Sequence, residues 1–241
     1  MTTQVLDAGF APPNVQITKR LPFEIRVATT PGDIAELVSV RSETYARHKA
    51  PGAEFLKAAE SQDGAPDAIL LIARAKIGGG VVGSVRIQTR LVHPLMVESA
   101  MALPSNITTC TPVELMRGSV RGGTAGRMVS AALAKASFLM AIELGFTHII
   151  VTCREPVDSM YRAYRFDDLL GGTMINLPYS PGAPHRVLCL PVAAASDRWR
   201  SNNLPLHEFM IGTVHPDIQL DFELAKDGLR RAAESKESVE A

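Results

Sequence analysis

The stretch that decides the fold runs from Pro112 to Phe166 and reads PVELMRGSVRGGTAGRMVSAALAKASFLMAIELGFTHIIVTCREPVDSMYRAYRF. Residues 113–120 have the composition of a β-strand, and residues 121–127 form a short loop that holds three glycines. Residues 128–144 carry apolar side chains at steps of three and four, which is the period of an amphipathic helix. The first part of the stretch therefore predicts a strand, a glycine loop and a helix in succession.

A second strand follows the helix after a short turn. Gly145 stands where the helix would end, because glycine readily adopts the left-handed conformation found at helix termini. The Ile-Ile-Val run within residues 148–153 is typical of a strand buried in a parallel sheet. Strand, loop, helix and strand together predict one βαβ unit with parallel strands and a right-handed crossover.

The glycine loop places unpaired backbone N–H groups at the start of the helix. With the helix dipole, such groups favour an anion, most often a phosphate. Gly122, Gly123 and Gly126 do not spell G-x-G-x-x-G, and no Lys-Ser or Lys-Thr follows Gly126, which excludes the dinucleotide and nucleoside-triphosphate loops. Taken alone, the loop is as consistent with a simple turn as with an anion site.

The unit resembles the core of the GNAT acyltransferases, whose pyrophosphate loop follows Gln/Arg-x-x-Gly-x-Gly/Ala. Arg121, Thr124 and Gly126 occupy the signature positions, with a threonine in place of the first glycine. The resemblance implies that the loop holds the phosphates of an acyl-phosphopantetheine donor, through Arg121, Gly122, Gly123, Thr124, Ala125, Gly126 and Arg127.

A second GNAT pattern, Tyr-x-x-x-Gly-Phe, falls on the segment after the second strand. Tyr161 and Phe166 match it, and Arg165 replaces its glycine. By this resemblance, Tyr161 is the candidate acid that protonates the leaving thiolate. A tyrosine that only packs a helix against the sheet fits the residues equally well.

The resemblance is more specific on the first strand, where Glu114 and Arg117 precede Val120. This is similar to the Glu-x-x-Arg-x-x-Val strand of the GNAT branch that comprises acyl-homoserine lactone synthases and long-chain N-acyl amino acid synthases. Glu114 is then the candidate general base, acting through a water, and Arg117 lies beside it. Residues three apart on a regular strand face opposite sides of the sheet, so a shared site requires a β-bulge between them. Without a bulge, the two would be separately paired charges.

Two further pairs match the same branch. Its first helix carries an arginine four residues before an aromatic residue, as Arg41 and Tyr45 do here, and its next strand carries Gly-x-x-Arg, as Gly83 and Arg86 do. The resemblance covers about residues 23–192. It implies an α/β (α+β) fold, a GNAT-like mixed and largely antiparallel twisted sheet flanked by helices, with a small C-terminal appendage.

Arg41 lies on the apolar stripe of a helix that begins at Thr30 as N-cap. Its side chain can lie at the edge of the stripe with its head in water, or point inward onto a carboxylate or a ligand. The branch that the motifs resemble places acidic residues near residues 61–67, a segment that predicts a surface loop, and Asp63 and Asp67 are the possible counterparts. Arg86 shares a strand face with polar residues, which suits solvent as well as a site. Arg41, Tyr45, Arg86 and Arg117 are the candidate binders of an acceptor carboxylate.

Composition bounds the class of protein. The chain has 241 residues, a formal net charge of zero and only 5 % aromatic residues, which argues against nucleic-acid and membrane surfaces. Its 3 cysteines show neither C-x-x-C nor zinc spacing, so we expect buried free thiols and no metal site. There is no signal pattern and no apolar run of membrane-spanning length, which predicts a cytoplasmic protein without a membrane span.

Three segments organise the chain. Residues 1–22 lack a period and predict an irregular arm, residues 23–192 form the GNAT-like acyltransferase domain, and residues 193–241 form an appendage with a charged tail. Ala193 to Ala195 reads as a linker between the last two. Within the domain, the resemblance assigns the acyl pocket to the segment after the Arg86 strand, with Leu91, Leu95, Met96 and Met101 as its apolar residues.

The motifs together predict an N-acyltransferase. It would move a medium or long acyl chain from acyl carrier protein or coenzyme A, as co-substrate and not as a tightly bound cofactor, to the amine of an amino acid or related acceptor. An acyl-homoserine lactone synthase, an ordinary acetyl-coenzyme A N-acetyltransferase and a catalytically silent thioester-binding protein are the alternatives. We expect acyl carrier protein as the donor, because five arginines cluster around the loop and the following helices: Arg121, Arg127, Arg154, Arg162 and Arg165.

Overall fold

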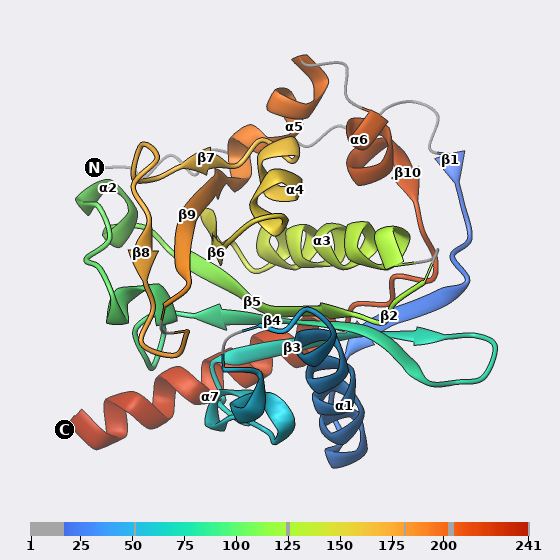
Figure 1. Ribbon diagram of the computed structural model, residues 1–241, viewed down its shortest axis with the longest axis horizontal. Coiled ribbons are helices and arrows are strands. Elements are labelled where there is room, and N and C mark those ends of the chain that lie inside the picture. Colours follow the sequence, from blue (N-terminus) through green and yellow to red (C-terminus); the bar gives the residue numbers. More distant parts are fainter. Residues whose placement is uncertain (1–16, 51, 124–125, 181, 202–204, 241) are drawn as a thin grey trace, which may run out of the picture.

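The computed structural model describes residues 17–50, 52–123, 126–180, 182–201 and 205–240. Its centre is a twisted sheet with the strand order β2-β3-β4-β5-β6-β9-β7, to which β8 adds by pairing with β9 (Figure 1). The strands are β2 Phe23–Val27, β3 Ala68–Ala75, β4 Val81–Thr89, β5 Pro112–Val120, β6 His148–Cys153, β7 Asp167–Asp168, β8 Ile175–Asn176 and β9 Pro184–Pro191.

The predicted βαβ unit lies in the middle of this sheet. β5 leads through the glycine loop into α3 (Gly126–Glu143), and β6 then pairs parallel to β5. The other neighbours in the sheet pair antiparallel. The mixed, largely antiparallel sheet flanked by helices is confirmed.

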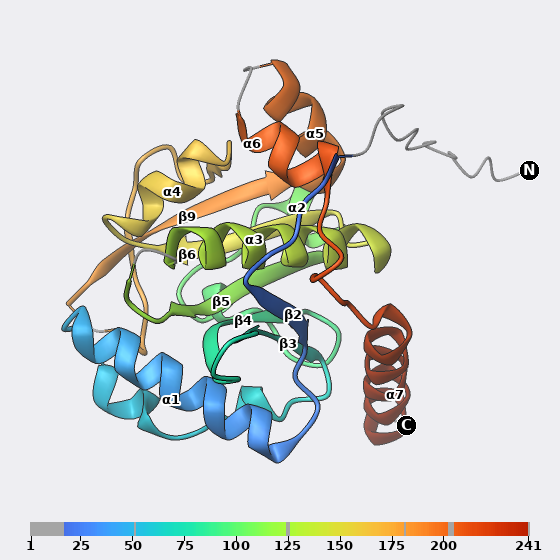
Figure 2. The same cartoon turned by 90° about the vertical axis from the view of Figure 1, so that its right-hand side faces the viewer.

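Each face of the sheet is covered by a different helix (Figure 2). Alternate residues of β3 to β9, among them Leu71, Ile87 and Leu115, point toward α3 and form the main apolar core. The intervening residues point toward α1 (Pro31–Arg47), where Leu37 and Val40 pack on Leu70, Ile72 and Val81. The face on which a functional side chain lies is therefore set by its place in the alternation along the strand.

The start of α1 shows why this helix forms where the sequence predicts it. Thr30 is the N-cap, its hydroxyl accepts from the N–H of Asp33, and Pro31 occupies the first turn. The Asp33 carboxylate is buried against Arg26, which donates to both of its oxygens at 2.9 and 2.5 Å. These bonds fix the entry of α1 onto the sheet and set the direction in which Arg41 and Tyr45 project.

Short helical segments connect the longer elements. η1, η2 and η3 are single 3₁₀ turns, and they carry the chain from α1 to β3 and from β4 to β5. Around the sheet, these segments are η1 Ala53–Lys57, η2 Ser61–Asp63, η3 Met96–Ser99, α2 Ser105–Thr108 and α4 Val157–Ala163. No helix in the described part of the chain combines the length and apolar character needed to cross a membrane.

The expected linker at Ala193–Ala195 is wrong. Those residues lie in the first turns of α5 (Val192–Ser201), which continues directly from β9. Trp199 on this helix is fully buried, meets the ring of Phe138 edge-on with centroids 4.8 Å apart, and donates from Nε1 to the Tyr164 carbonyl at 2.9 Å. The segment after residue 192 is therefore continuous with the main core.

The rest of the C-terminal segment returns across the molecule. It forms α6 (Pro205–His207), the π-turn η4 (Glu208–Gly212), β10 (Thr213–Val214) and α7 (Phe222–Glu240). Ala225 and Leu229 on α7 pack against the main core, so the predicted charged tail is a helix with one buried stripe.

A buried lysine ties this segment to α3. Lys135 Nζ donates to the Phe209 carbonyl at 2.8 Å, to His215 Nδ1 at 3.1 Å and to the Thr213 carbonyl. Burial lowers the pKa of Lys135 to about 8 and that of His215 to about 4, so the imidazole is neutral and accepts from the ammonium at neutral pH. His215 is thus part of the interior.

The N-terminal arm is held by the same segment. β1 (Ile17–Thr18) pairs parallel to β10, and the Leu21 N–H donates to Asp217 Oδ2 at 2.7 Å. Asp217 also pairs with Arg20 at 3.0 Å and Lys76 at 2.6 Å. Further along, Ile25 on the outer edge of β2 forms a parallel bridge with Ile218. Residues 213–219 thus cover the edge of the sheet.

Candidate active site

A β-bulge interrupts β5 between Glu114 and the glycine loop. Ser84 of β4 pairs with Ser119 and Arg86 pairs with Met116, so two steps along β4 correspond to three along β5. The extra residue falls at Arg117, whose φ of 54° is left-handed. The bulge that a shared site for Glu114 and Arg117 would require is therefore present.

The bulge brings both functional side chains to the α1 face of the sheet. Glu114 lies opposite Gln88 on that face, and Arg117, which would otherwise point toward α3, meets residues of the loop that precedes β3. The β5–β6 ladder ends at Leu115 and Val151, while β5 runs on to Val120. In the described part of the chain, no strand pairs with β5 beyond Leu115 on the β6 side.

Glu114 is completely buried in the centre of this face. Its Oε2 accepts from the Val97 N–H at 3.0 Å, and its Oε1 accepts from the Thr152 hydroxyl at 3.0 Å. Burial raises the pKa of Glu114 to about 7, although both hydrogen bonds favour the charged form. A carboxyl group with this pKa exchanges protons at neutral pH, as a general base must.

Arg117 is held by a carboxylate that the sequence did not single out. Its Nε and Nη2 donate to Glu60 at 2.8 and 2.6 Å, in the bidentate geometry that arginine favours. Its guanidinium also lies over the ring of Tyr179, 4.9 Å from the centroid. Tyr179 Oη in turn lies 3.4 Å from the Thr152 hydroxyl. Tyr179 and Thr152 therefore link Arg117 to Glu114.

Two more arginines lie behind this pair. Arg41 donates to both oxygens of Asp63 at 3.0 and 2.8 Å, and Arg86 donates to Asp63 at 3.0 Å. Both guanidiniums also reach Glu60, at 3.3 and 3.2 Å. Each arginine is 1 % exposed. They bind the protein's own carboxylates, and the Arg41 side chain takes the inward alternative.

The acidic partners come from the segment that predicted a surface loop. This expectation is wrong for its two aspartates, because Asp63 and Asp67 are buried. Asp67 accepts from the N–H groups of Val92 and His93, both at 3.2 Å, and so has no contact with the arginines. Asp63 and Glu60 are the carboxylates that contact the arginines.

Opposing effects set the pKa values of these two acids. Burial acts to raise the pKa of Glu60 and of Asp63, but the hydrogen bonds to these carboxylates and the positive charges of the arginines together outweigh it and hold both pKa values below normal. The two carboxylates are charged at neutral pH. The cluster of Arg41, Arg86, Arg117, Glu60 and Asp63 thus holds three positive and two negative charges.

Three residues of the site were missed from the sequence. Glu60 carries a local signal, because Glu60 and Asp63 form the capping box of η2. Thr152 has only its place on β6 two residues after Ile150, which directs its side chain to the Glu114 face. Tyr179 follows β8 in an irregular segment, and no spacing in the sequence points to it.

The two predicted aromatic residues lie near the network. Tyr45 lies on α1 one turn after Arg41, whose guanidinium belongs to the network. Tyr161 packs edge-on against Phe166, with centroids 5.2 Å apart, and burial raises its pKa well above the usual value. Its hydroxyl is therefore protonated at neutral pH and available as a donor.

Arg165 explains how the chain departs from the Tyr-x-x-x-Gly-Phe pattern without losing its geometry. Its φ is 64°, the left-handed conformation that glycine adopts freely. Phe166 N–H then donates to the Tyr161 carbonyl at 3.1 Å and closes the end of α4. The arginine thus keeps the backbone conformation of the glycine that it replaces.

The glycine loop lies at the end of β5 against α1. Arg121 donates to Glu43 at 3.2 Å, Gly123 has a φ of 122°, and Gly126 begins α3. Arg127 is exposed beside them. Thr124 and Ala125 lie outside the described residues.

An apolar cluster borders Glu114 on the side of β6 and β9. It is built on three strand residues, Ile150, Val187 and Cys189. Four buried residues of the segment between β4 and β5 pack on them, namely Leu95, Val97, Leu103 and Ile107, and the partly buried Met101 packs against the same cluster. Of the other residues expected to form an acyl pocket, Met96 contacts Gln62 and Leu91 is 39 % exposed, so Leu91 lies outside the cluster.

Gln88 is a further polar residue on the Glu114 face. It is 2 % exposed, and its Oε1 has no hydrogen-bond partner among the described residues. Within the described ranges, no group of three or more His, Cys, Asp or Glu side chains is arranged to hold a metal ion. A cavity of about 530 Å³ lies elsewhere, between the start of α1, the loop at Gly64 and α7.

Solved structures share this architecture at low sequence identity. The N-acyl amino acid synthase FeeM from uncultured soil microbes superposes with a TM-score of 0.62 and 15% identity, over 78% of this chain and 98% of FeeM. The coenzyme A-dependent acyl-homoserine lactone synthase BjaI gives a TM-score of 0.56 and 13% identity, over 87% of this chain and 98% of BjaI. The acyl-homoserine lactone synthase LasI gives a TM-score of 0.53 and 12% identity, over 72% of this chain and 93% of LasI.

No family model and no curated protein matches the sequence. The likeness to solved structures therefore concerns the course of the backbone. This likeness, together with the mixed sheet, the central βαβ unit and the bulge, identifies the architecture. The chain has the GNAT fold, in the form found in N-acyl amino acid synthases and acyl-homoserine lactone synthases.

Proposed function

We propose that this chain is a cytoplasmic N-acyltransferase that moves a medium or long acyl chain from a phosphopantetheine thioester to the amine of an amino acid or related acceptor. The observation that carries the proposal is the Glu114 carboxyl group. It is buried beside the bulge and has a pKa of about 7, in a fold shared with N-acyl amino acid synthases. The residues proposed for the reaction all lie within residues 23–192.

Acyl transfer to an amine needs a base, a stabilised carbonyl oxygen and an acid for the thiolate. Glu114 takes the proton of the amine, through a water, because both carboxylate oxygens already accept hydrogen bonds from the protein. A backbone N–H beyond Leu115, where the β5–β6 ladder has ended, donates to the thioester oxygen. Tyr161 supplies the proton to the leaving thiolate.

The charge of the arginine cluster favours an acceptor that carries a carboxylate. Among the described residues, the ion pairs of Arg41, Arg86 and Arg117 are made with Glu60 and Asp63, so one positive charge of the cluster has no counterion there. Arg117 is the most accessible of the three arginines, with 10% of its side chain exposed. An amino acid whose carboxylate approaches Arg117 would neutralise this charge and place its amine toward Glu114.

Acyl carrier protein is the donor that the loop favours over coenzyme A. Its pantetheine carries one phosphodiester and no adenosine, so a loop with threonine in place of the first signature glycine would suffice. Arg127 and Arg162 are exposed on either side of this region, and Arg121 borders it. These cations would attract an acidic carrier, and the attraction would weaken with salt.

The test is direct product analysis. The purified chain is incubated with the same acyl group on acyl carrier protein or on coenzyme A, together with a panel of amino acids, and products are identified by mass spectrometry. An N-acyl amino acid formed by the wild type, and at a rate at least about a hundredfold lower by Glu114→Gln, is the expected result.

Other outcomes select the remaining alternatives. A homoserine lactone product from S-adenosylmethionine identifies a lactone synthase, and activity restricted to acetyl-coenzyme A identifies an ordinary acetyltransferase. Tight binding of the thioester without turnover of any amine would contradict enzymatic function and identify a binding protein.

A further inference from the structure

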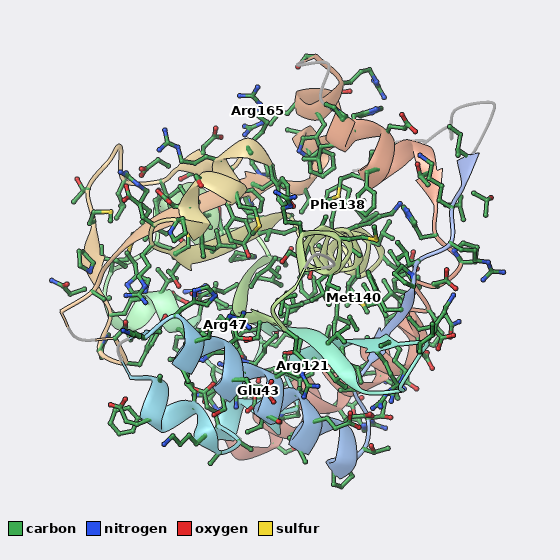
Figure 3. The ribbon with its side chains drawn as sticks, turned by 45° about the vertical axis from the view of Figure 1, so that its right-hand side comes forward. Glu43, Arg47, Arg121, Phe138, Met140 and Arg165 are labelled. Carbon is green, nitrogen blue, oxygen red and sulfur yellow. The ribbon has the colours of Figure 1, made fainter. Side chains whose placement is uncertain are left out.

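Arg47, in the last turn of α1, lies directly on the glycine loop. Its Nη2 donates to the Val120 carbonyl at 2.9 Å, at the point where β5 enters the loop. A Cβ atom added to Gly122 would lie 3.0 Å from Arg47 Nη1, so the guanidinium packs against the bare backbone of the loop. Figure 3 shows Arg47 and Arg121 together where α1 meets the end of β5.

The two arginines differ in how their charges are balanced. Arg121 is paired with Glu43 at 3.2 Å. Among the described residues, no carboxylate lies within ion-pair distance of Arg47. A guanidinium has five N–H donors, and the Val120 carbonyl takes one of those on Arg47. Arg47 therefore presents a fixed, uncompensated cation and several donors at the surface of the loop.

We infer that Arg47 is a phosphate-binding residue, which holds the phosphate next to the pantetheine of the donor between α1 and the start of α3. The inference rests on the proposed function, because that function supplies a phosphopantetheine donor. Two planar N–H groups of one guanidinium match two phosphate oxygens, and the loop on which Arg47 packs leads into the first turn of α3, an end of a helix that favours an anion. The sequence patterns did not single out Arg47, since it lies on a different element from the loop.

The position of Arg47 also gives phosphate binding a second effect. Thr44, one turn earlier on α1, donates to the same Val120 carbonyl at 3.1 Å. A phosphate bound by Arg47 and the loop would add a third connection between α1 and the end of β5. Because α1 also carries Arg41 and Tyr45, donor binding would hold the arginine cluster in place before the acceptor enters.

The test compares Arg47→Gln with wild type on three donors that carry the same acyl chain. The donors are acyl-pantetheine, which has no phosphate, acyl-phosphopantetheine and acyl-coenzyme A. We expect KM for both phosphate-bearing donors to rise about tenfold or more in Arg47→Gln, with kcat and the KM for acyl-pantetheine unchanged. Arg47→Lys should recover part of the loss, since it keeps the charge and loses the planar fork.

Arg230→Gln is the matched control, because Arg230 is an exposed arginine paired with Asp227 on α7. It should leave all three KM values unchanged, and circular dichroism should show the same fold for each variant. Equal increases in KM for all three donors, or no increase for any, would overturn the role of Arg47.

Calorimetric binding of phosphopantetheine and of pantetheine separates this inference from the proposed function. Wild type that binds phosphopantetheine tightly, with Arg47→Gln weaker by about tenfold, supports Arg47 even if no amine is acylated. Failure of every donor to react in wild type counts against the proposed function alone, whereas equal binding of phosphopantetheine by wild type and Arg47→Gln refutes the inference.

Discussion

Two opposing influences meet on a single carboxyl group at Glu114. Full burial favours its neutral form, while the Val97 N–H and the Thr152 hydroxyl favour its charged form, and burial prevails. Glu60 belongs to the neighbouring arginine cluster and is also partly buried. Its pKa is lowered and not raised, because it accepts hydrogen bonds directly from arginine. Contact with a cation is therefore what separates a permanently charged structural carboxylate from one that titrates near neutral pH.

The first prediction concerns the pH dependence of turnover. The base is active as a carboxylate, so kcat should fall about tenfold per pH unit below a midpoint near 7 and level off above it. The measurement is kcat against pH at saturating donor and acceptor. Glu114→Gln should have a low kcat that does not fall further below pH 7. A wild-type midpoint below 5 would show that a group other than Glu114 titrates.

The same shift predicts a stability effect of the opposite sign. The folded state binds the Glu114 proton more tightly than the unfolded state, so this group costs stability as pH rises from about 4.5 to about 7. Glu114→Gln should therefore melt at a higher temperature than wild type at pH 8, and the difference should vanish near pH 4.5. Equal melting temperatures at both pH values would contradict the burial of a charged Glu114.

Tyr161 and Tyr164 allow a matched test of the proposed acid. Both pKa values are raised by burial, both rings pack in the main core, and the rings meet each other edge-on 6.4 Å apart. Tyr161→Phe should lower kcat about tenfold or more because the thiolate loses its proton donor, while Tyr164→Phe should leave kcat unchanged. Similar kcat values for the two variants would reduce Tyr161 to a packing residue.

Among the elements, β5 combines pairing and irregularity within nine residues. Its first half forms ladders with both β4 and β6, and its second half, beyond Leu115, pairs with β4 alone and contains the bulge. The left-handed backbone at Arg117 is strained for any residue other than glycine. This strained conformation directs the Arg117 guanidinium toward Glu60.

This strain can be measured with two substitutions. Arg117→Ala and Arg117→Gly both remove the ion pair with Glu60, but only glycine adopts a φ of 54° without steric cost. Arg117→Gly should therefore be more stable than Arg117→Ala by about 1 kcal/mol in denaturant unfolding. At regular strand positions the order is reversed, so a less stable glycine variant would argue against the bulge.

The same element shows how far the sequence could predict the site. The βαβ unit, the N-cap at Thr30 and the bulge followed from local patterns, because each depends on residues within a few turns. The partners of Arg117 did not follow, since Glu60 lies 57 residues before it and Tyr179 stands in a segment without a period. Long-range ion pairs depend on where the chain returns, and periodicity carries no such information.

On the scale of the whole molecule, the segment after residue 192 belongs to the interior. Trp199 is completely buried, and its indole N–H satisfies the Tyr164 carbonyl at the end of α4, the helix that carries Tyr161. Burial of a tryptophan contributes several kcal/mol. The C-terminal segment therefore supports both the core and the position of the proposed acid.

Trp199→Ala should destabilise the protein by about 3 to 5 kcal/mol, since it leaves a large cavity and an unpaired carbonyl. The measurement is denaturant unfolding, with Arg200→Ala as the control on the exposed side of the same helix. A loss below about 1 kcal/mol would mean that burial of Trp199 contributes little to the stability of the core.

The cover of β2 by residues 213–219 has a consequence for protein synthesis. β2 is the outer strand of the sheet, and the Ile25 N–H donates to the Asp217 carbonyl at 2.8 Å. The chain leaves the ribosome from its N-terminus, so Asp217 emerges 196 residues after Leu21, to which it is bonded. Until then the backbone of β2 remains open to a strand of another nascent chain. A version ending before Thr213 should thus aggregate as it is made, even where the β5–α3–β6 unit has already folded.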